Sequence, residues 1–140
     1  YRNITRRGNL EDVLRGIEAA KEAGLTPIKI NCVVKQSSAE ADARAVKAFA
    51  GANGLQARFI REMNLETGDF GVVEGGEGGN CSMCNRLRLT SDGKIKPCLF
   101  SDLGFDVREL GAEQALRLAI SDKPKSGTHS HMNKFSNIGG

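Results

Sequence analysis

Three of the four cysteines have the spacing of a metal centre. Cys81 and Cys84 form a CxxC pair, and Cys98 follows after thirteen residues. Two thiolates with this spacing can bind one metal centre, because the turn between them brings both sulfur atoms to one side. The spacing alone leaves three interpretations open. They are a [4Fe-4S] cluster with one iron open to a substrate, a zinc site closed by His129 or His131, and a disulfide with a spare thiol.

The residues after the CxxC pair predict a β-hairpin, with strands at 86–90 and 94–100 and a turn at 91–93. A three-residue turn sets the register of the two strands, so that Thr90 pairs with Lys94, Arg88 with Lys96, and Arg86 with Cys98. One face is then apolar and carries Leu87, Leu89, Ile95, Pro97 and Leu99. The other face carries Arg86, Arg88, Lys94, Lys96 and Cys98.

The cationic face next to the cysteines is what an anionic ligand requires, although a solvated strand has the same pattern. We expect Arg86 and Arg88 to clamp an anion, and Lys94 and Lys96 to be solvated. His129 and His131 are expected to be solvated unless they close a zinc site.

Helical and strand patterns alternate before this hairpin. A helix is predicted from Leu10 to Ala23, capped by Asn9, and a second from Ser37 or Ser38 to about residue 50. Strands are predicted at 28–34, where Cys32 is expected in the core, and at 55–63. This order predicts a parallel strand pair, which leaves sheet edges uncovered. We therefore expect the other half of the fold to lie before residue 1.

The rest of the chain is less regular. Six glycines lie between Gly68 and Gly79, so that segment is either mobile or shaped around something. One helix is predicted over 107–120, with apolar positions at Val107, Leu110, Leu116, Leu118 and Ile120. We divide the chain into an α/β region at 1–66, a glycine-rich linker at 67–80, a cysteine module at 81–121 and a tail at 122–140.

Composition limits the protein's class. The 140 residues are 39% hydrophobic and 26% charged, a balance that can bury a core. No apolar run is long enough to cross a membrane, and a net charge of +3 is too small to indicate DNA binding. We expect a cytoplasmic protein with neither membrane nor DNA as a partner. The sequence leaves open whether it forms a homodimer.

Several segments resemble one known family. CSMCNRLRLT at 81–90, DGK at 92–94 and KPCLF at 96–100 resemble the C-terminal cluster segment of molybdenum cofactor biosynthesis protein A. That family comprises the radical S-adenosylmethionine (SAM) GTP cyclases. KIN at 29–31 and RFI at 58–60 with Met63 resemble its later barrel strands. The terminal Gly139 and Gly140 resemble its double-glycine tail.

This resemblance implies an α/β fold: the C-terminal portion of a partial (β/α) radical-SAM barrel, followed by a small β-hairpin and helix iron–sulfur module. In the family, a cluster held by CxxxCxxC cleaves SAM to a radical, and an auxiliary [4Fe-4S] cluster binds GTP. The product is the first intermediate of molybdenum cofactor biosynthesis.

The resemblance also implies roles for individual residues. Cys81, Cys84 and Cys98 would hold the auxiliary cluster, and Met63 would lie at the SAM site. The tail glycines Gly139 and Gly140 would reach into the active site. GTP would be contacted by Lys29, Arg86, Leu87 and Arg88.

The chain departs from the family pattern in three ways. It contains no CxxxCxxC motif, so we expect the chain by itself to be inactive. Only eighteen positions separate Met63 from Cys81, where the family has a much longer connection, and Arg61 replaces an acidic residue. Two alternatives therefore stay open: a radical-SAM relative acting on another substrate, and a zinc-stapled binding module that is not an enzyme.

Overall fold

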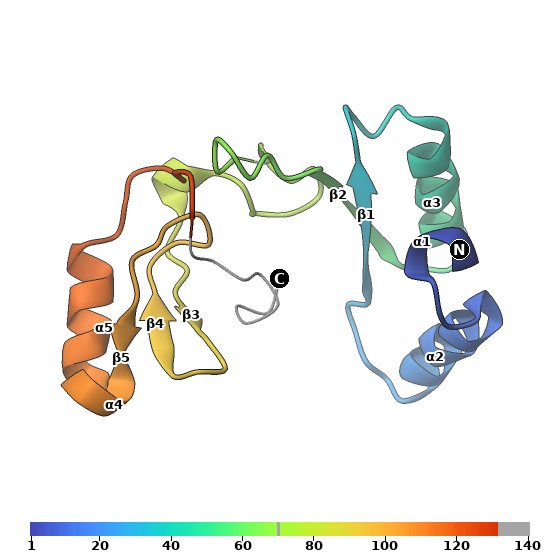
Figure 1. Cartoon of the computed structure of the whole chain (residues 1–140). Helices are drawn as coiled ribbons and strands as arrows, with labels where there is room; N and C mark the ends of the chain where they lie inside the picture. Colours follow the sequence, from blue (N-terminus) through green and yellow to red (C-terminus); the bar gives the residue numbers. More distant parts are fainter. Residues whose placement is uncertain (70, 132–140) are drawn as a thin grey trace.

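The computed structural model describes residues 1–69 and 71–131. The chain is a mixed α/β protein whose strands form a parallel pair and a separate three-stranded antiparallel sheet. Figure 1 shows the two sheets lying apart, joined by the glycine-rich segment. No helix in the described ranges is long and apolar enough to cross a membrane.

The N-terminal region begins with two helices, α1 (Arg2–Thr5) and α2 (Leu10–Glu22). The prediction for α2 is confirmed, because the side chain of Asn9 accepts a hydrogen bond from the backbone N–H of Glu11 at 3.3 Å. None of the residues of α2 is buried, although the helix is amphipathic.

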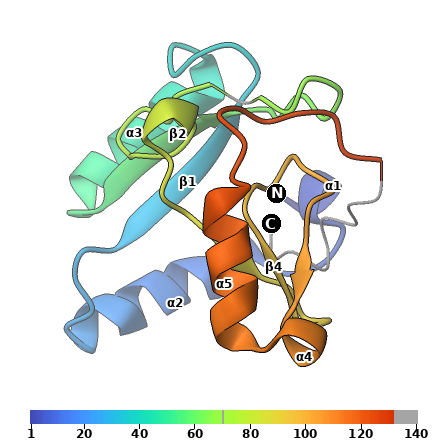
Figure 2. The ribbon, with the colours of Figure 1, turned by 90° about the vertical axis from the view of Figure 1, so that its left-hand side faces the viewer.

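The parallel pair consists of β1 (Lys29–Val34) and β2 (Gln56–Arg61), connected through α3 (Ala41–Ala52). This confirms the predicted parallel arrangement. Figure 2 shows α3 lying along one side of the two strands. Val34, Ala43 and Phe59 form the core between the helix and the sheet. Cys32 packs against this core, as the sequence predicts.

Helix α3 begins later than predicted, and its N-cap residue is Glu40 rather than Ser37 or Ser38. The Glu40 carboxylate accepts hydrogen bonds from the backbone N–H groups of Gln36 at 2.6 Å and Ser37 at 3.1 Å. The carboxylate therefore organises the loop before the helix, which the serine positions in the sequence did not reveal.

These hydrogen bonds predict a pH-dependent contribution to stability. The backbone N–H groups of Gln36 and Ser37 lower the pKa of Glu40 from its usual value of 4.5. Because the pKa is lower in the folded chain, the stabilisation is complete above about pH 4.5 and is lost as the pH falls through the folded value. We expect Glu40→Gln to lower the free energy of unfolding at neutral pH, and the difference from the wild type to shrink in acid.

Urea unfolding at about pH 7 and about pH 3 measures this difference. The matched control is Glu22→Gln, which changes an exposed carboxylate at the end of α2. A Glu40→Gln difference that stays constant across this pH range would contradict the assigned role.

The C-terminal sheet has the predicted hairpin at its centre. A 3₁₀ turn, η1 (Cys81–Met83), precedes strands β3 (Arg88–Leu89), β4 (Lys94–Lys96) and β5 (Phe105–Asp106). Arg88 pairs with Lys96, and the Thr90 N–H donates to the Lys94 carbonyl at 2.9 Å, which confirms the predicted register. The ladder stops at Arg88, so it does not include the predicted pair of Arg86 and Cys98. Strand β5 was not predicted.

The predicted helix over 107–120 is wrong as a single element. It is broken at Gly111 into α4 (Val107–Leu110) and α5 (Ala112–Ser121). Gly111 adopts φ 75° and ψ 155°, a conformation that continues no helix and that residues with a side chain rarely adopt.

The buried face of α5 also differs from the prediction. Ala115 and Ala119 are fully buried against Ile95 of β4. The larger residues Leu110, Leu116 and Ile120 are exposed. Small residues at the contact allow the helix to approach the sheet closely. This is why the alanines, and not the larger apolar residues, face the sheet.

The glycine-rich segment folds back onto β2. Phe59 and Glu74 exchange backbone hydrogen bonds of 2.9 and 3.1 Å, forming an antiparallel bridge on the edge of the parallel pair. The segment is therefore shaped by β2, and it covers part of an otherwise open strand edge.

Candidate functional site

The CxxC pair lies on a single turn. The backbone N–H of Cys84 donates to the carbonyl of Cys81 at 3.2 Å, closing the 3₁₀ turn η1. Both thiols are exposed, and neither forms a disulfide. Next to the turn, the Ser82 hydroxyl donates to the side-chain oxygen of Asn80 at 2.7 Å. The turn thus presents two reduced sulfurs on one short piece of backbone.

Cys98 lies two residues beyond β4 and is half-buried. It packs against Leu99 and Phe100, and its thiol is also free. Within 1–69 and 71–131, no three His, Cys, Asp or Glu side chains are placed so that together they could hold a metal ion. The structure therefore provides three unpaired thiols in one module without gathering them around a common centre.

This set of donors fits an iron–sulfur cluster in its chemistry. Cluster irons are bound by thiolates, and none of the three cysteines is engaged in a disulfide. The backbone next to the CxxC turn and the backbone next to Cys98 are also neighbours, because Lys123 donates hydrogen bonds to the carbonyls of both Arg86 and Pro97.

The cationic face of the hairpin is present but differs in detail from the prediction. Lys94 is exposed as predicted, whereas Lys96 is buried, with 7% of its surface exposed. Burial lowers the pKa of Lys96, and the charges of Asp102 and Cys98 partly oppose that shift. The prediction of a solvated Lys96 is wrong because Gly104, in the loop after β4, lies next to its side chain, with the Lys96 Cγ 3.8 Å from the place a Cβ of Gly104 would take.

The two arginines lie differently on this face. Arg88 is half-buried opposite Lys96, so two cationic residues are neighbours across the ladder. Arg86 is exposed, and its guanidinium lies over Gly78, with Nη1 3.5 Å from the place a Cβ would take. Such a concentration of positive charge is suited to phosphate or carboxylate ligands.

The predicted apolar face is only partly buried. Leu87 packs with Ile95 against α5, whereas Leu89 is 69% exposed. The side chain of Leu87 is therefore directed into the core. A ligand contact at this position would have to come from the Leu87 backbone.

Lys29 and Met63 lie near opposite ends of the parallel pair. Lys29 begins β1 opposite Gln56, and Met63 follows the end of β2. At about 3.3 Å per residue, the two positions are roughly 20 Å apart along the strands. Both side chains are exposed. One small ligand cannot contact both, so they suit either two ligands or an elongated site.

Arg58 is a residue that the sequence analysis did not assign to a site. It lies in β2 opposite Asn31, on the face of the pair that α3 does not cover. Its Nε is fully buried and has no hydrogen-bond partner, and it lies 3.3 Å from the place a Cβ of Gly76 would take. A buried guanidinium N–H without an acceptor is costly, which makes Arg58 a candidate donor to an anionic ligand. The sequence offered little signal for this role, because β2 mixes polar and apolar residues and contains both Arg58 and Arg61.

The segment 128–131 is anchored to the loop after Cys98. Thr128 donates to the Phe100 carbonyl from its backbone N–H at 2.8 Å and from its hydroxyl at 2.9 Å. The Ser130 hydroxyl and the His131 N–H donate to Asp102 at 2.6 and 3.1 Å. The rings of His129 and His131 meet edge to face, with centroids 4.2 Å apart. Gly139 and Gly140 lie outside the described residues.

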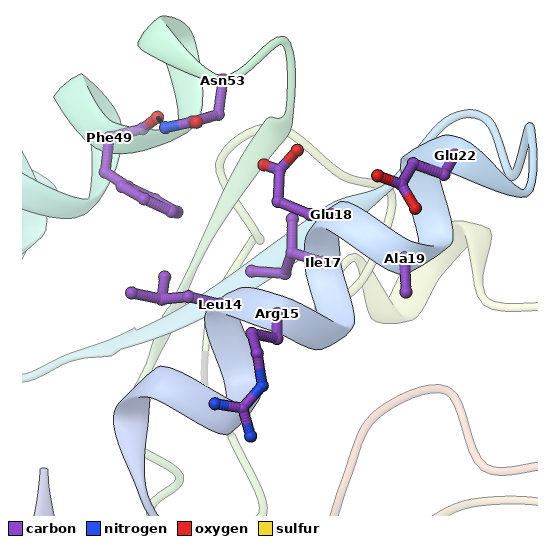
Figure 3. Close-up of a pocket in the computed structure, with 8 residues that line it drawn as sticks. All are labelled: Leu14, Arg15, Ile17, Glu18, Ala19, Glu22, Phe49 and Asn53. Carbon is purple, nitrogen blue, oxygen red and sulfur yellow. Dashed lines mark hydrogen bonds between the residues drawn. The ribbon is translucent and has the colours of Figure 1, made fainter.

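A shallow groove between α2 and α3 is lined by none of the candidate site residues described above (Figure 3). Leu14, Ile17 and Phe49 line its apolar part, and Arg15, Glu18, Glu22 and Asn53 lie at its rim. None of the cysteines or candidate ligand-binding residues lines this groove. It reflects the incomplete burial of α2 rather than the chemistry of the cysteine module.

Comparison with known families decides the chain's relationships. The family model of Molybdenum Cofactor Synthesis C matches residues 25–131, which is more than half of the chain. The chain belongs to this family. The match includes both sheets and all three cysteines of the candidate site.

Curated proteins with related sequences carry the name GTP 3′,8-cyclase. GTP 3′,8-cyclase 2 of Mycobacterium bovis is 31% identical over 86% of this chain and 50% of its own length. The GTP 3′,8-cyclase of Moorella thermoacetica is 31% identical over 77% of this chain and 47% of its own. The chain spans about half the length of these relatives. No solved structure matches it.

The matched stretch is longer in the relatives than in this chain. The match to the Mycobacterium bovis protein runs over 179 residues but includes only 86% of these 140, which is about 120. About 60 positions of the relative therefore have no counterpart here. The short connection between Met63 and Cys81 agrees with such a difference in length.

Proposed function

We propose that this chain is the nucleotide-binding C-terminal part of a radical-SAM GTP cyclase that acts in molybdenum cofactor biosynthesis. The main support is the family match, which spans the CxxC turn, Cys98 and the neighbouring cationic residues. The names of the curated relatives support GTP as the substrate. In this proposal, β1, α3 and β2 are the last part of a partial (β/α) barrel, and the module from η1 to α5 is the auxiliary cluster module.

Cys81, Cys84 and Cys98 would hold an auxiliary [4Fe-4S] cluster. When bound, such a cluster supplies one iron without a cysteine ligand, where a donor atom of the nucleotide can coordinate. The chain's own residues then orient GTP. Arg86 and Arg88 balance the charge of the phosphates.

The parallel pair would provide the rest of the nucleotide and SAM contacts. Lys29 and Arg58 lie on the strand pair, and Arg58 supplies a buried donor that lacks an acceptor. Met63, beyond the opposite end of the pair, would contact SAM. Gly139 and Gly140 would reach the active site, where the lack of a Cβ permits close approach.

The chain by itself should not cleave SAM. It has no CxxxCxxC motif to hold the radical-generating cluster, so that cluster must be supplied by another part of the protein or by another chain. Formation of 5′-deoxyadenosine by the isolated chain under reducing conditions would contradict this part of the proposal.

The nucleotide site predicts the effect of Arg86→Ala. Loss of a charge-assisted contact of about 1.5–3 kcal/mol should weaken GTP binding to the cluster-loaded chain by about 10- to 100-fold. Equilibrium dialysis with labelled GTP measures the affinity. The matched control is Arg117→Ala, because Arg117 is an exposed arginine that pairs with Glu113 on the same helix, α5.

If Arg86→Ala binds GTP with wild-type affinity, Arg86 is not part of the nucleotide site. Equal weakening in both variants would show a general effect of charge rather than a specific contact. Binding of another nucleotide more tightly than GTP would support a relative that acts on a different substrate.

A zinc-stapled binding module is a second candidate function. It is favoured by the anchoring of 128–131 to Asp102, which holds two histidines near the loop after Cys98. Thiolates and imidazoles are common zinc ligands. Substitution of both His129 and His131 by Gln distinguishes the two functions, since only a zinc site should lose its metal.

A further inference from the structure

We propose that Lys123 is a positioning residue for the auxiliary cluster site. Its ammonium group ties the backbone just after the CxxC turn to the backbone just before Cys98. This inference rests on the proposed function, because it gives Lys123 a role only if the three cysteines hold a common metal centre.

The contacts of Lys123 join two distant parts of the sequence. Its Nζ donates to the carbonyl of Arg86 at 2.8 Å and to the carbonyl of Pro97. Arg86 lies two residues after Cys84, and Pro97 directly precedes Cys98. Pro97 is fully buried, and Lys123 is half-buried. One amino group therefore holds both backbone segments that carry the thiols.

This bridge stands where the β-ladder ends. The β3–β4 ladder contains only the pairs Arg88–Lys96 and Leu89–Ile95. Arg86 and Cys98 would be the next pair on the same face, but the ladder does not reach them. The Lys123 ammonium crosslinks the two segments at this point and fixes their separation.

Lys123 acts on the backbone next to the thiols, through its two carbonyl acceptors. Groups of this kind, which orient metal ligands without touching the metal, commonly change metal affinity by about 10- to 100-fold when they are removed.

The test is the rate at which the reconstituted 140-residue chain loses iron to a chelator, followed by its visible absorption. We expect Lys123→Met to lose iron about 10-fold faster than the wild type. Lys123→Arg should restore most of the retention, since a guanidinium can also donate to two carbonyls. The matched control is Lys125→Met, which removes an exposed lysine two residues away and should leave the rate unchanged.

Urea unfolding of the cluster-free chains completes the test. Faster iron loss in Lys123→Met with little change in the unfolding midpoint, together with rescue by Lys123→Arg, supports the proposal. An unchanged rate of iron loss in Lys123→Met overturns the proposal. Faster iron loss also overturns it if the cluster-free variant unfolds at a much lower urea concentration than the wild type, because general instability would then explain the loss. A wild-type chain that binds no iron would instead refute the proposed function itself, so the two failures are distinguishable.

Discussion

Substitution of Cys84 by Ala is expected to abolish iron binding almost completely. The variant removes one of two thiols on the η1 turn and leaves two cysteines for a cluster that requires three protein thiolates. After anaerobic reconstitution, the chain should show little iron and no absorption band near about 400 nm. Iron analysis and a visible spectrum of the same sample measure both quantities.

Cys32→Ala is the matched control for this experiment. Cys32 lies in β1 and packs against the core of Val34, Ala43 and Phe59 between α3 and the parallel pair, and it belongs to neither the CxxC turn nor the hairpin. Its loss should leave the iron content at the wild-type level. Equal iron in Cys84→Ala and the wild type would exclude Cys84 as a ligand, and equal loss in both variants would indicate adventitious binding to thiols.

Substitution of Gly79 by Ala is expected to have the largest effect on stability. Gly79 precedes the CxxC turn and has φ +81°, and a Cβ there would lie 1.6 Å from the carbonyl oxygen of Gly71. A left-handed backbone and a steric clash both oppose the added methyl group. We expect the free energy of unfolding to fall by about 3 kcal/mol or more. Urea unfolding of the cluster-free chain measures the loss.

Gly24→Ala separates the two causes. Gly24 has φ +74°, but no heavy atom lies within 4 Å of the place its Cβ would take. This variant introduces the backbone strain without the clash, so it should cost only about 1 kcal/mol. Similar losses in Gly24→Ala and Gly79→Ala would show that the close approach to Gly71 does not constrain the glycine-rich segment.

The parts of the fold fixed by local pattern were predictable from the sequence. The Asn9 cap, the parallel order of the first two strands and the pairing of Arg88 with Lys96 follow from helix signals, hydrophobic runs and turn length. A one-residue change of register would have placed Leu89 opposite Lys96 and mixed the apolar and cationic faces of the hairpin, so the side-chain pattern selects one pairing.

Other features depend on contacts that local pattern does not encode. The break at Gly111 and the burial of Ala115 arise because α5 must pack closely on β4. The burial of Lys96 depends on the loop after β4. At these positions, tertiary contacts override the local helix and strand propensities of the sequence.

Some residues of the candidate site were also predictable from the sequence, and others were not. The cysteines could be identified from their spacing, which reflects the chemistry of a shared metal centre. Lys123 could not, because it contacts carbonyls 26 and 37 residues earlier in the chain. Arg58 was also missed, since only the structure shows that its Nε is buried without an acceptor.

Metal and sulfide analysis of the wild-type chain after strictly anaerobic purification tests the central claim most directly. An auxiliary cluster predicts about four irons and a matching amount of sulfide per chain, with an absorption band near about 400 nm. One tightly bound zinc without iron or sulfide in that sample would contradict the cluster assignment, and the chain would then be a zinc-stapled binding module.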